Sequence, residues 1–231
     1  MSKKGGTYCL GAVCIVFMEF KPQIKLFITG TLKEMKMDER GNCVVTITTN
    51  AERELRNVRI RFYDIAKVML YRVRDHVKVE AHIQNHPYMA DGERRFRQEL
   101  IGDSINKSQR RLSTLLEQDI DTAVLRTGQQ DENWGIIVGN VQSIFSPNDK
   151  ATVLTVTVPR GERQQRCTIS CLGRFKSIAD KLKENDRIAA TVYVSVRESD
   201  ETHPFSQNLV CTDLFQFQNE EIQNAEEEDY E

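Results

Sequence analysis

The sequence predicts a mainly β chain made of two tandem five-stranded barrels, joined by a linker helix and followed by a disordered acidic tail. Three observations predict this: blocks that recur at an offset near 109 residues, the same order of strand and helix patterns in each copy, and seven acids with no base over residues 219–231. The expected divisions are an N-terminal extension over 1–21, barrels over 22–105 and 131–218, the helical linker over 106–130 and the tail over 219–231.

The repeat is clearest where RFRQELIGDSI (95–105) matches PFSQNLVCTDL (204–214), 109 residues later. The other blocks keep the same order: CVVTITT (43–49) over TVLTVTV (152–158), NVRIRF (57–62) over RCTISC (166–171), Gly30 over Gly139, and, at an offset of 111, KVEAHI (78–83) over AATVYV (189–194). This ordered recurrence predicts a duplication. The shared Phe, Gln and aliphatic positions of the last block are expected to record how each barrel closes.

Each copy repeats the same series of elements. Alternating apolar residues predict strands over 24–32, 44–49 and 58–63 in the first copy, and over 135–141, 153–158 and 167–172 in the second. A helical stretch follows (65–73; 175–186), and then two strands joined by a polar loop (85–95; 197–204). Five strands with a helix between the third and fourth is the order of the OB-fold, a partly open Greek-key barrel. An SH3-like barrel is the rival, but it has no helix at that place.

The segment between the copies, 106–128, carries apolar residues at helical spacing and ends at Gly128, a natural stop. The stripe consists of Leu112, Leu115, Leu116, Ile120, Ala123 and Val124. We expect this helix to pack on one barrel or between the two; a dimerisation helix is the alternative.

Composition excludes several classes of protein. No apolar run reaches the roughly 18 residues of a membrane span, and the apolar stretch 8–20 is either a buried strand or a dispensable extension. The six cysteines form no C-x-x-C pair, which favours reduced thiols in a cytoplasmic protein. No metal, cofactor or catalytic motif stands out, so neither a cofactor nor an enzyme is expected. Residues 1–218 hold 32 bases against 34 − 7 = 27 acids, a body of about +5 beside the acidic tail.

The third strand of the first copy carries the strongest binding pattern. In VRIRFY (58–63) the apolar residues share one parity, which turns Arg59, Arg61 and Tyr63 to the other face. Guanidinium groups neutralise phosphates and an aromatic ring stacks on a base, so this row suits a single-stranded nucleic acid. The corresponding residues of the second copy, Thr168, Ser170 and Leu172, suit it less. A solvated strand face is the alternative interpretation.

Further candidates lie on other strands and in loops. Phe27 and Trp134 face outward on the first strands, and Tyr193 does so on the fourth strand of the second copy. Basic loop residues beside an OB-fold face commonly form an electrostatic groove. The basic candidates are Arg94, Arg95, Arg97, Arg160, Arg163, Arg166 and Arg174, and the aromatic Tyr88 lies near the first three in the sequence.

The second half, from GIIVGNV (135–141) through SIADKLKEND (177–186) to FSQNLVCTDLFQF (205–217), resembles the OB domain of bacterial and phage single-stranded DNA-binding proteins. The first half is similar through ITGTL, VRIRFYDIAKV and VKVEAHI, so the resemblance covers about 22–105 and 133–217. It implies sequence-tolerant binding and protection of single-stranded DNA in replication, recombination or repair. An RNA-binding module and a protein-interaction hub are the alternatives.

In that family an acidic C-terminal tail recruits replication and recombination proteins. The matching residues here are Glu226, Glu227, Glu228, Asp229, Tyr230 and Glu231. The family's tail ends in a Pro-Phe pair that this chain lacks, and the family's stacking aromatic maps to Tyr63 in one copy but near Leu172 in the other. Most members carry one OB domain per chain and form tetramers, so a chain with two is expected to be a homodimer or a monomer.

Overall fold

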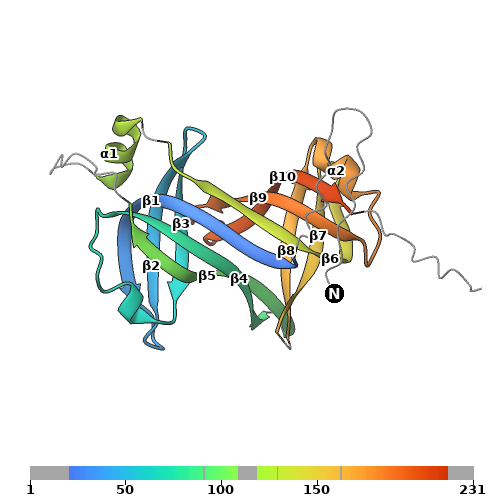
Figure 1. The fold of residues 1–231 in the computed structure, drawn as a ribbon, viewed down its shortest axis with the longest axis horizontal. Coiled ribbons are helices and arrows are strands. Elements are labelled where there is room, and N and C mark those ends of the chain that lie inside the picture. Colours follow the sequence, from blue (N-terminus) through green and yellow to red (C-terminus); the bar gives the residue numbers. More distant parts are fainter. Residues whose placement is uncertain (1–20, 91, 109–118, 129, 162, 218–231) are drawn as a thin grey trace, which may run out of the picture.

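The computed structural model describes residues 21–90, 92–108, 119–128, 130–161 and 163–217 (Figure 1). The predicted mainly β class is confirmed. The strands are β1 (Gln23–Met37), β2 (Cys43–Ala51), β3 (Glu54–Phe62), β4 (His76–Ala90), β5 (Glu93–Lys107), β6 (Asn133–Asn148), β7 (Ala151–Arg160), β8 (Arg163–Leu172), β9 (Arg187–Arg197) and β10 (Ser206–Gln216). The helical elements are the 3₁₀ turn η1 (Ile65–Lys67), α1 (Ile120–Thr127) and α2 (Arg174–Ala179).

Strands β1 to β5, called barrel 1 below, form a closed sheet. Strand β1 pairs with both β2 and β4, β2 pairs with β3, β3 with β5, and β5 with β4. Strands β6 to β10, called barrel 2, pair in the same order, with β6 joined to β7 and β9. In each barrel the closing seam is a short parallel pairing, β3 with β5 or β8 with β10, and all other pairings are antiparallel. A closed five-stranded barrel of the OB type is therefore present.

The two barrels meet along β1 and β6, which run side by side in opposite directions (Figure 1). Leu26 lies opposite Gly135, its own counterpart at the offset of 109. An antiparallel pairing centred on two corresponding residues relates the barrels by an approximate two-fold axis. Leu26 occupies the space that a side chain at position 135 would need, since a Cβ added there would lie 2.3 Å from Leu26 Cδ2.

The interior of each barrel is filled by one parity of its strands. On β3, Val58, Ile60 and Phe62 are fully buried, and the residues between them turn outward. Gly30 and Gly139 lie in matching environments, because a Cβ at either would stand 2.3 or 2.4 Å from the carbonyl oxygen of Thr48 or Thr157. These glycines allow β1 to cross close over β2, and β6 over β7.

The helix expected over 65–73 is wrong: only Ile65–Lys67 is helical, as a 3₁₀ turn begun by the Asp64 carboxylate. The chain beyond it returns to β1, where the backbone N–H of Arg74 donates to Leu32 O and that of Leu32 to Asp75 O. These bonds compete with helix continuation. In barrel 2, α2 ends at Ala179 rather than continuing to 186.

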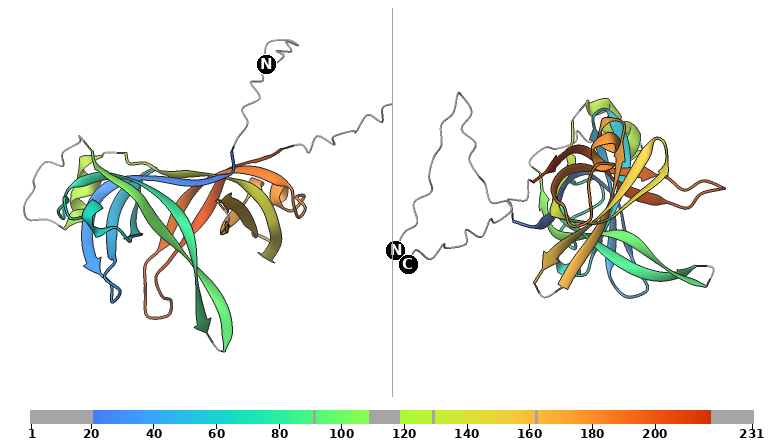
Figure 2. Two further views of the ribbon diagram at one scale, coloured as in Figure 1. Left: turned by 60° about the horizontal axis from the view of Figure 1, so that its bottom comes forward. Right: turned by 90° about the vertical axis from the view of Figure 1, so that its right-hand side faces the viewer.

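The polar loop expected over 85–95 is also wrong. Strands β4 and β5 stay paired from Asn85↔Gln98 to Ala90↔Glu93 and form a long hairpin, drawn in green in Figure 2. The side chains described here, at 85, 86, 89, 96, 97 and 98, are exposed or half-buried rather than part of the barrel core. The sequence therefore lacks the apolar alternation that would have predicted strands. The loop expected over 197–204 does separate β9 from β10.

Helix α1 lies on barrel 1. Asp119 caps its N-terminus, Gly128 ends it in the left-handed conformation, and Val124 is buried. Asp121 accepts hydrogen bonds from Lys33 Nζ (2.5 Å) and Thr48 Oγ1 (3.0 Å). The expected apolar positions 112, 115 and 116 lie outside the described residues, as do residues 1–20 of the expected extension and the tail 219–231.

None of the helices in the described part of the chain is both long enough and apolar enough to cross a membrane.

Candidate nucleic-acid interface

The outer face of β3 carries the row that the sequence pattern singled out. Arg59 is exposed and Arg61 is half-buried, both on the side opposite the core, and Tyr63, one residue beyond the strand, is 48% exposed. Beside this row, Met37, Thr46, Arg59 and neighbouring residues line a shallow groove of about 250 Å³. The alternation of β3 therefore places two guanidinium groups and one ring on a single surface.

Arg61 is held by two carboxylates. Its guanidinium contacts Asp38, from the turn after β1, and donates from Nε to Glu99 Oε2 of β5 at 2.8 Å. Partial burial lowers the pKa of Arg61, but hydrogen bonding to Glu99 and the charges of Glu99 and Asp38 outweigh it, so this pKa is raised. Arg61 is charged but largely neutralised, and it contributes less to a cationic surface than its position suggests.

Arg59 lies where barrel 2 touches barrel 1. Its guanidinium stands 3.6 Å from the ring centroid of Phe205, just before β10. The backbone N–H of Arg59 donates to Gln207 Oε1 (3.1 Å), and Gln207 Nε2 donates to Arg59 O (2.8 Å). Phe205 was not among the predicted site residues, although the repeat had aligned it with Phe96. Arg59 and Phe205 together form a cationic and aromatic surface.

Tyr63 extends the row toward β4. Its hydroxyl donates to Gln84 Oε1 (3.2 Å) and lies 3.3 Å from His86 Nε2. Partial burial raises the pKa of Tyr63 above its usual value, with smaller opposing effects from nearby charges, so the phenol is neutral. The hydroxyl contacts hold one edge of the ring and leave about half of the residue exposed for stacking.

The corresponding face of barrel 2 is less cationic, as its sequence indicates. Thr168 and Ser170 are half-buried on β8, and Leu172 is 44% exposed. The backbone of Thr168 is in contact with Gln98 of barrel 1. The two faces correspond in position but differ in chemistry.

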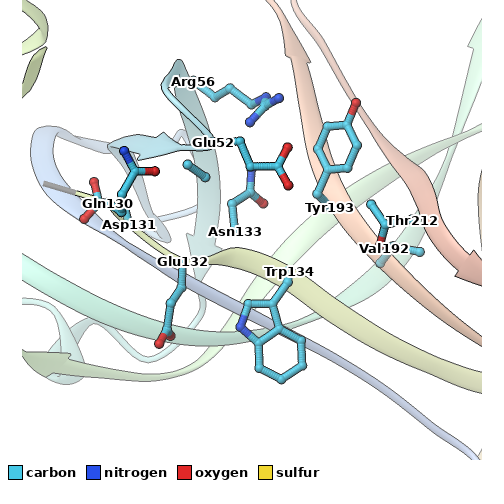
Figure 3. Close-up of a pocket in the computed structure, with 11 residues that line it drawn as sticks. Glu52, Arg56, Gln130, Asp131, Glu132, Asn133, Trp134, Val192, Tyr193 and Thr212 are labelled. Carbon is cyan, nitrogen blue, oxygen red and sulfur yellow. The ribbon is translucent and has the colours of Figure 1, made fainter. Parts of the chain in front are cut away.

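Three predicted aromatics gather elsewhere, at the junction of the barrels. The rings of Phe27 and Trp134 are 4.7 Å apart, and Trp134 and Tyr193 line a cleft of about 330 Å³ (Figure 3). The guanidinium of Arg56, buried at the other end of β3, stands 4.7 Å from the Tyr193 ring centroid. Glu52, Asp131 and Glu132 also line this cleft, as Glu34 and Asp38 line the groove beside the β3 row.

The predicted basic residues of the loops are distributed over both barrels. Arg97 is exposed with Nε 3.7 Å from Glu99 Oε1, and Arg160 Nη2 lies 3.8 Å from Asp103 Oδ1 of barrel 1. Arg163 and Arg166 are exposed on β8. Arg174 begins α2, 4.6 Å from the ring centroid of Phe175.

The structure describes only the backbone of three further candidates, which lie in the β4–β5 hairpin where Tyr88 pairs with Arg95 and Met89 with Arg94. The six tail residues, 226–231, lie outside the described residues. The hairpin itself lies against β8, because Asn85 Nδ2 donates to Arg166 O at 3.0 Å. The basic hairpin of one copy and the basic strand of the other are therefore neighbours.

Within the described residues, no group of three or more His, Cys, Asp or Glu side chains is arranged to hold a metal ion.

No family profile and no curated protein matches this sequence. Among solved structures, a deletion mutant of the single-stranded DNA-binding protein from Thermus aquaticus is similar over 87% of this chain and 99% of its own, with a TM-score of 0.56 at 16% identity. The wild-type protein from the same organism is similar over 86% of this chain and 95% of its own, with a TM-score of 0.54 at 14% identity. At this identity the likeness concerns the fold.

Proposed function

We propose that this protein binds single-stranded DNA without strong sequence preference and protects it during replication, recombination or repair. The observation that carries the proposal is the likeness of fold over 87% of the chain to a protein that binds single-stranded DNA. OB barrels serve many functions, so the fold alone is insufficient. The side chains on the outer face of β3 supply the second argument.

Arg59 and Tyr63 give that face the two interactions on which single-strand binders depend. A guanidinium neutralises phosphate, and an exposed ring stacks on a base, which contributes about 1–3 kcal/mol per base. Neither interaction reads a base edge, so binding is expected to tolerate any sequence. The β4–β5 hairpin lies against β8, and the exposed Arg97, Arg163 and Arg166 on these two elements extend the cationic surface.

The proposal includes a duplicated chain with two OB domains of unequal roles. Matching environments at Gly30 and Gly139 support the duplication. Barrel 1 carries the Arg and Tyr row, whereas the corresponding strand of barrel 2 carries Thr168, Ser170 and Leu172. We assign the stronger DNA contacts to barrel 1. Assembly as a homodimer and recruitment of replication or recombination proteins by tail residues 226–231 complete the proposal.

Titration of a fluorescently labelled oligo-dT by anisotropy, at several salt concentrations, tests the proposal. Affinity should fall steeply and linearly in log–log form as salt rises, because phosphate neutralisation releases counterions. Duplex DNA of the same length should bind more weakly, and oligo-U in a parallel series compares RNA with DNA. Absence of binding at low salt, or an affinity indifferent to salt, would overturn the proposal.

A protein-interaction hub is the second candidate, and two observations favour it. Arg61 is neutralised by Asp38 and Glu99, and Met69 and Leu70 expose most of their apolar surface beside η1. Deletion of residues 219–231 distinguishes the candidates. For a DNA-binding protein, removing the acidic tail should tighten oligo-dT binding at low salt, because the tail competes with DNA for basic surface. A hub would show no change.

A further inference from the structure

Two cysteines meet at the closing seam of barrel 2. Strands β8 and β10 pair in parallel at Leu209↔Ile169 and Val210↔Ser170, and the next residue on each strand is a cysteine, Cys211 or Cys171. Both side chains point into the core, with 4% and 0% of their surface exposed. Both thiols are free.

Barrel 1 closes the same seam with other residues. The counterparts of Cys171 and Cys211 at the offset of 109 are Phe62 and Gly102, on β3 and β5. The Phe62 ring lies directly over Gly102, since a Cβ added at Gly102 would stand 2.2 Å from two ring carbons. In barrel 1 the phenylalanine ring therefore fills the space that the glycine leaves at the seam, whereas in barrel 2 two thiols occupy the corresponding positions.

The two thiols contact each other. The Cys211 S–H has two acceptors within reach, the sulfur of Cys171 and, at 3.2 Å, the carbonyl oxygen of Asp213. The hydrogen bond from Cys211 lowers the pKa of Cys171 against the opposing effect of burial, and the same contact raises the pKa of Cys211. Cys171 is thus the better nucleophile of the pair, because the thiolate is the reactive form.

The remaining described cysteines provide a contrast. Burial raises the pKa of Cys167 to about 12 and also raises the pKa of Cys43. Within the part of the chain that the structure describes, neither lies beside a second thiol at a strand seam. They serve as internal controls within one chain.

We propose that Cys171 and Cys211 are a peroxide-sensitive dithiol, whose oxidation to a disulfide covalently closes barrel 2. Neighbouring strands lie about 4.8 Å apart, which falls within the Cα separation of about 4.4–6.8 Å that a disulfide spans. The Cys171 thiolate attacks one oxygen of hydrogen peroxide, the O–O bond breaks, and hydroxide leaves to yield a sulfenic acid. The Cys211 sulfur then attacks the Cys171 sulfur, the S–O bond breaks and water leaves. In total, two thiols and one peroxide give one disulfide and two waters.

The position of the pair at the seam explains how peroxide reaches buried thiols. Only two residue pairs join β8 to β10, whereas ten join β8 to β7. The pairing of β10 with β9 is also interrupted between Cys211 and Asp213. A seam with so few hydrogen bonds opens locally at lower free energy than the rest of the barrel, which admits the oxidant. A covalent bond at this place supplies the closure that the short ladder lacks.

The experiment treats the fully reduced, full-length protein with hydrogen peroxide, quenches with catalase, unfolds and alkylates it, and maps the peptides without reduction. A linked pair of peptides containing Cys171 and Cys211, lighter by two hydrogen atoms, is the expected product, while Cys43 and Cys167 are recovered alkylated. The melting temperature should rise on the order of 5–10 °C and return after dithiothreitol. In Cys211→Ser, Cys171 should be trapped by dimedone as the sulfenic acid, with no rise in melting temperature.

A double variant, Cys171→Phe with Cys211→Gly, gives barrel 2 the pair that barrel 1 uses and is the matched control. It should fold and lose the response to peroxide; if it fails to fold, Cys171→Ser with Cys211→Ser takes its place. Recovery of both thiols alkylated after treatment of the wild-type protein would overturn the proposal. So would a disulfide between other cysteines, or a rise in melting temperature that persists in the double variant.

Discussion

The side-chain amide of Gln98 in barrel 1 makes two hydrogen bonds to the backbone of Thr168 in barrel 2. The N–H of Thr168 donates to Gln98 Oε1 at 2.6 Å, and Gln98 Nε2 donates to Thr168 O at 3.3 Å. Gln207 of barrel 2 makes the same pair of bonds to Arg59 of barrel 1. Gln207 and Thr168 are the counterparts of Gln98 and Arg59 at the offset of 109, so the two pairs of hydrogen bonds are equivalent. The shared glutamines of the repeat therefore join the barrels, rather than closing each one as the sequence suggested.

Replacement of Gln98 by Ala should lower the free energy of unfolding by about 1–2 kcal/mol, because the N–H and C=O of Thr168 lose their partner at a half-buried site. Gln207→Ala should cost a similar amount. Urea denaturation measures both. Gln164→Ala, an exposed glutamine on β8, should stay within about 0.5 kcal/mol of wild type. A loss at Gln164 as large as that at Gln98 would contradict the assignment.

Gly30 and Gly139 should be equally intolerant of a side chain. An alanine Cβ would stand 2.3 or 2.4 Å from a backbone carbonyl oxygen, so β1 or β6 must move away from its neighbour. We expect Gly30→Ala and Gly139→Ala each to cost about 3 kcal/mol or more. Gly41→Ala, in a turn with nothing within 4 Å, should cost only about 1–2 kcal/mol because of its positive φ. Thermal and urea unfolding compare the three; a clearly milder effect at one core glycine would argue against matching environments.

Binding of oligo-dT should depend on Tyr63 and Arg59 more than on Arg61. Loss of stacking in Tyr63→Ala should weaken binding about 5- to 150-fold, and Arg59→Ala should reduce the magnitude of the salt slope by about one. Arg61→Ala should weaken binding less, since Asp38 and Glu99 already neutralise this residue. Fluorescence anisotropy at several salt concentrations measures each variant.

The matched variants for this comparison lie on β8. Leu172→Ala, at the position that corresponds to Tyr63, should change the affinity less than twofold. The double variant Arg59→Ala with Arg61→Ala should weaken binding more than the double variant Thr168→Ala with Ser170→Ala. Circular dichroism confirms that each variant is folded. Equal losses on β3 and β8 would show that the two barrels share the DNA contacts evenly.

Asp180, at the end of α2, should make barrel 2 sensitive to acid. Its carboxylate accepts hydrogen bonds from Lys176 Nζ (2.6 Å) and from the hydroxyl of Thr152, and these bonds lower the pKa of Asp180. The folded pKa lies below the unfolded value of about 3.9, so the stabilisation is complete above that value and is lost as pH falls through the folded pKa.

Melting temperatures measured from acid to neutral pH test this. Asp180→Asn should melt below wild type near neutral pH, and the difference should shrink below about pH 4. Asp149→Asn, an exposed turn residue of the same barrel, is the control. A difference for Asp180→Asn that is constant over the whole range would mean that the ionised form of Asp180 does not stabilise the fold.

Local patterns predicted the features that depend on local geometry. The alternation of VRIRF placed Val58, Ile60 and Phe62 in the core and Arg59 outward, because side chains alternate between the faces of a strand. A glycine inside a strand pattern is typical of a place where another backbone approaches closely, and at Gly30 and Gly139 a neighbouring carbonyl oxygen does so. Each of these follows from the residue and its immediate neighbours.

Contacts between distant segments were beyond such patterns. The ion pairs of Arg61 come from Asp38 and Glu99, which follow β1 and lie on β5. The hairpin of β4 and β5 carries no apolar alternation, because it is supported by β8 of the other barrel rather than by a core of its own. A polar strand whose support comes from another domain resembles a loop when it is examined alone.

At the first residue of the turn between β2 and β3, barrel 1 has a glutamate where barrel 2 has a glycine. Glu52 and Arg53 both have positive φ, 54° and 65°, as a two-residue hairpin turn requires. The counterpart of Glu52 in barrel 2 is Gly161, with φ 60° and no Cβ. A left-handed conformation costs a residue with a side chain about 1–2 kcal/mol. Glycine avoids this cost, but its unfolded state has more conformational entropy, which offsets part of the stabilisation. Glu52→Gly should therefore stabilise the protein by about 1 kcal/mol.

Two other substitutions are the controls for this prediction. Gly161→Glu should destabilise the protein by a similar amount. Glu184→Gly, at an exposed position whose φ is not positive, should be neutral or destabilising. Urea unfolding measures all three, and destabilisation by Glu52→Gly would show that the glutamate contributes contacts at the barrel junction that outweigh the strain of its backbone.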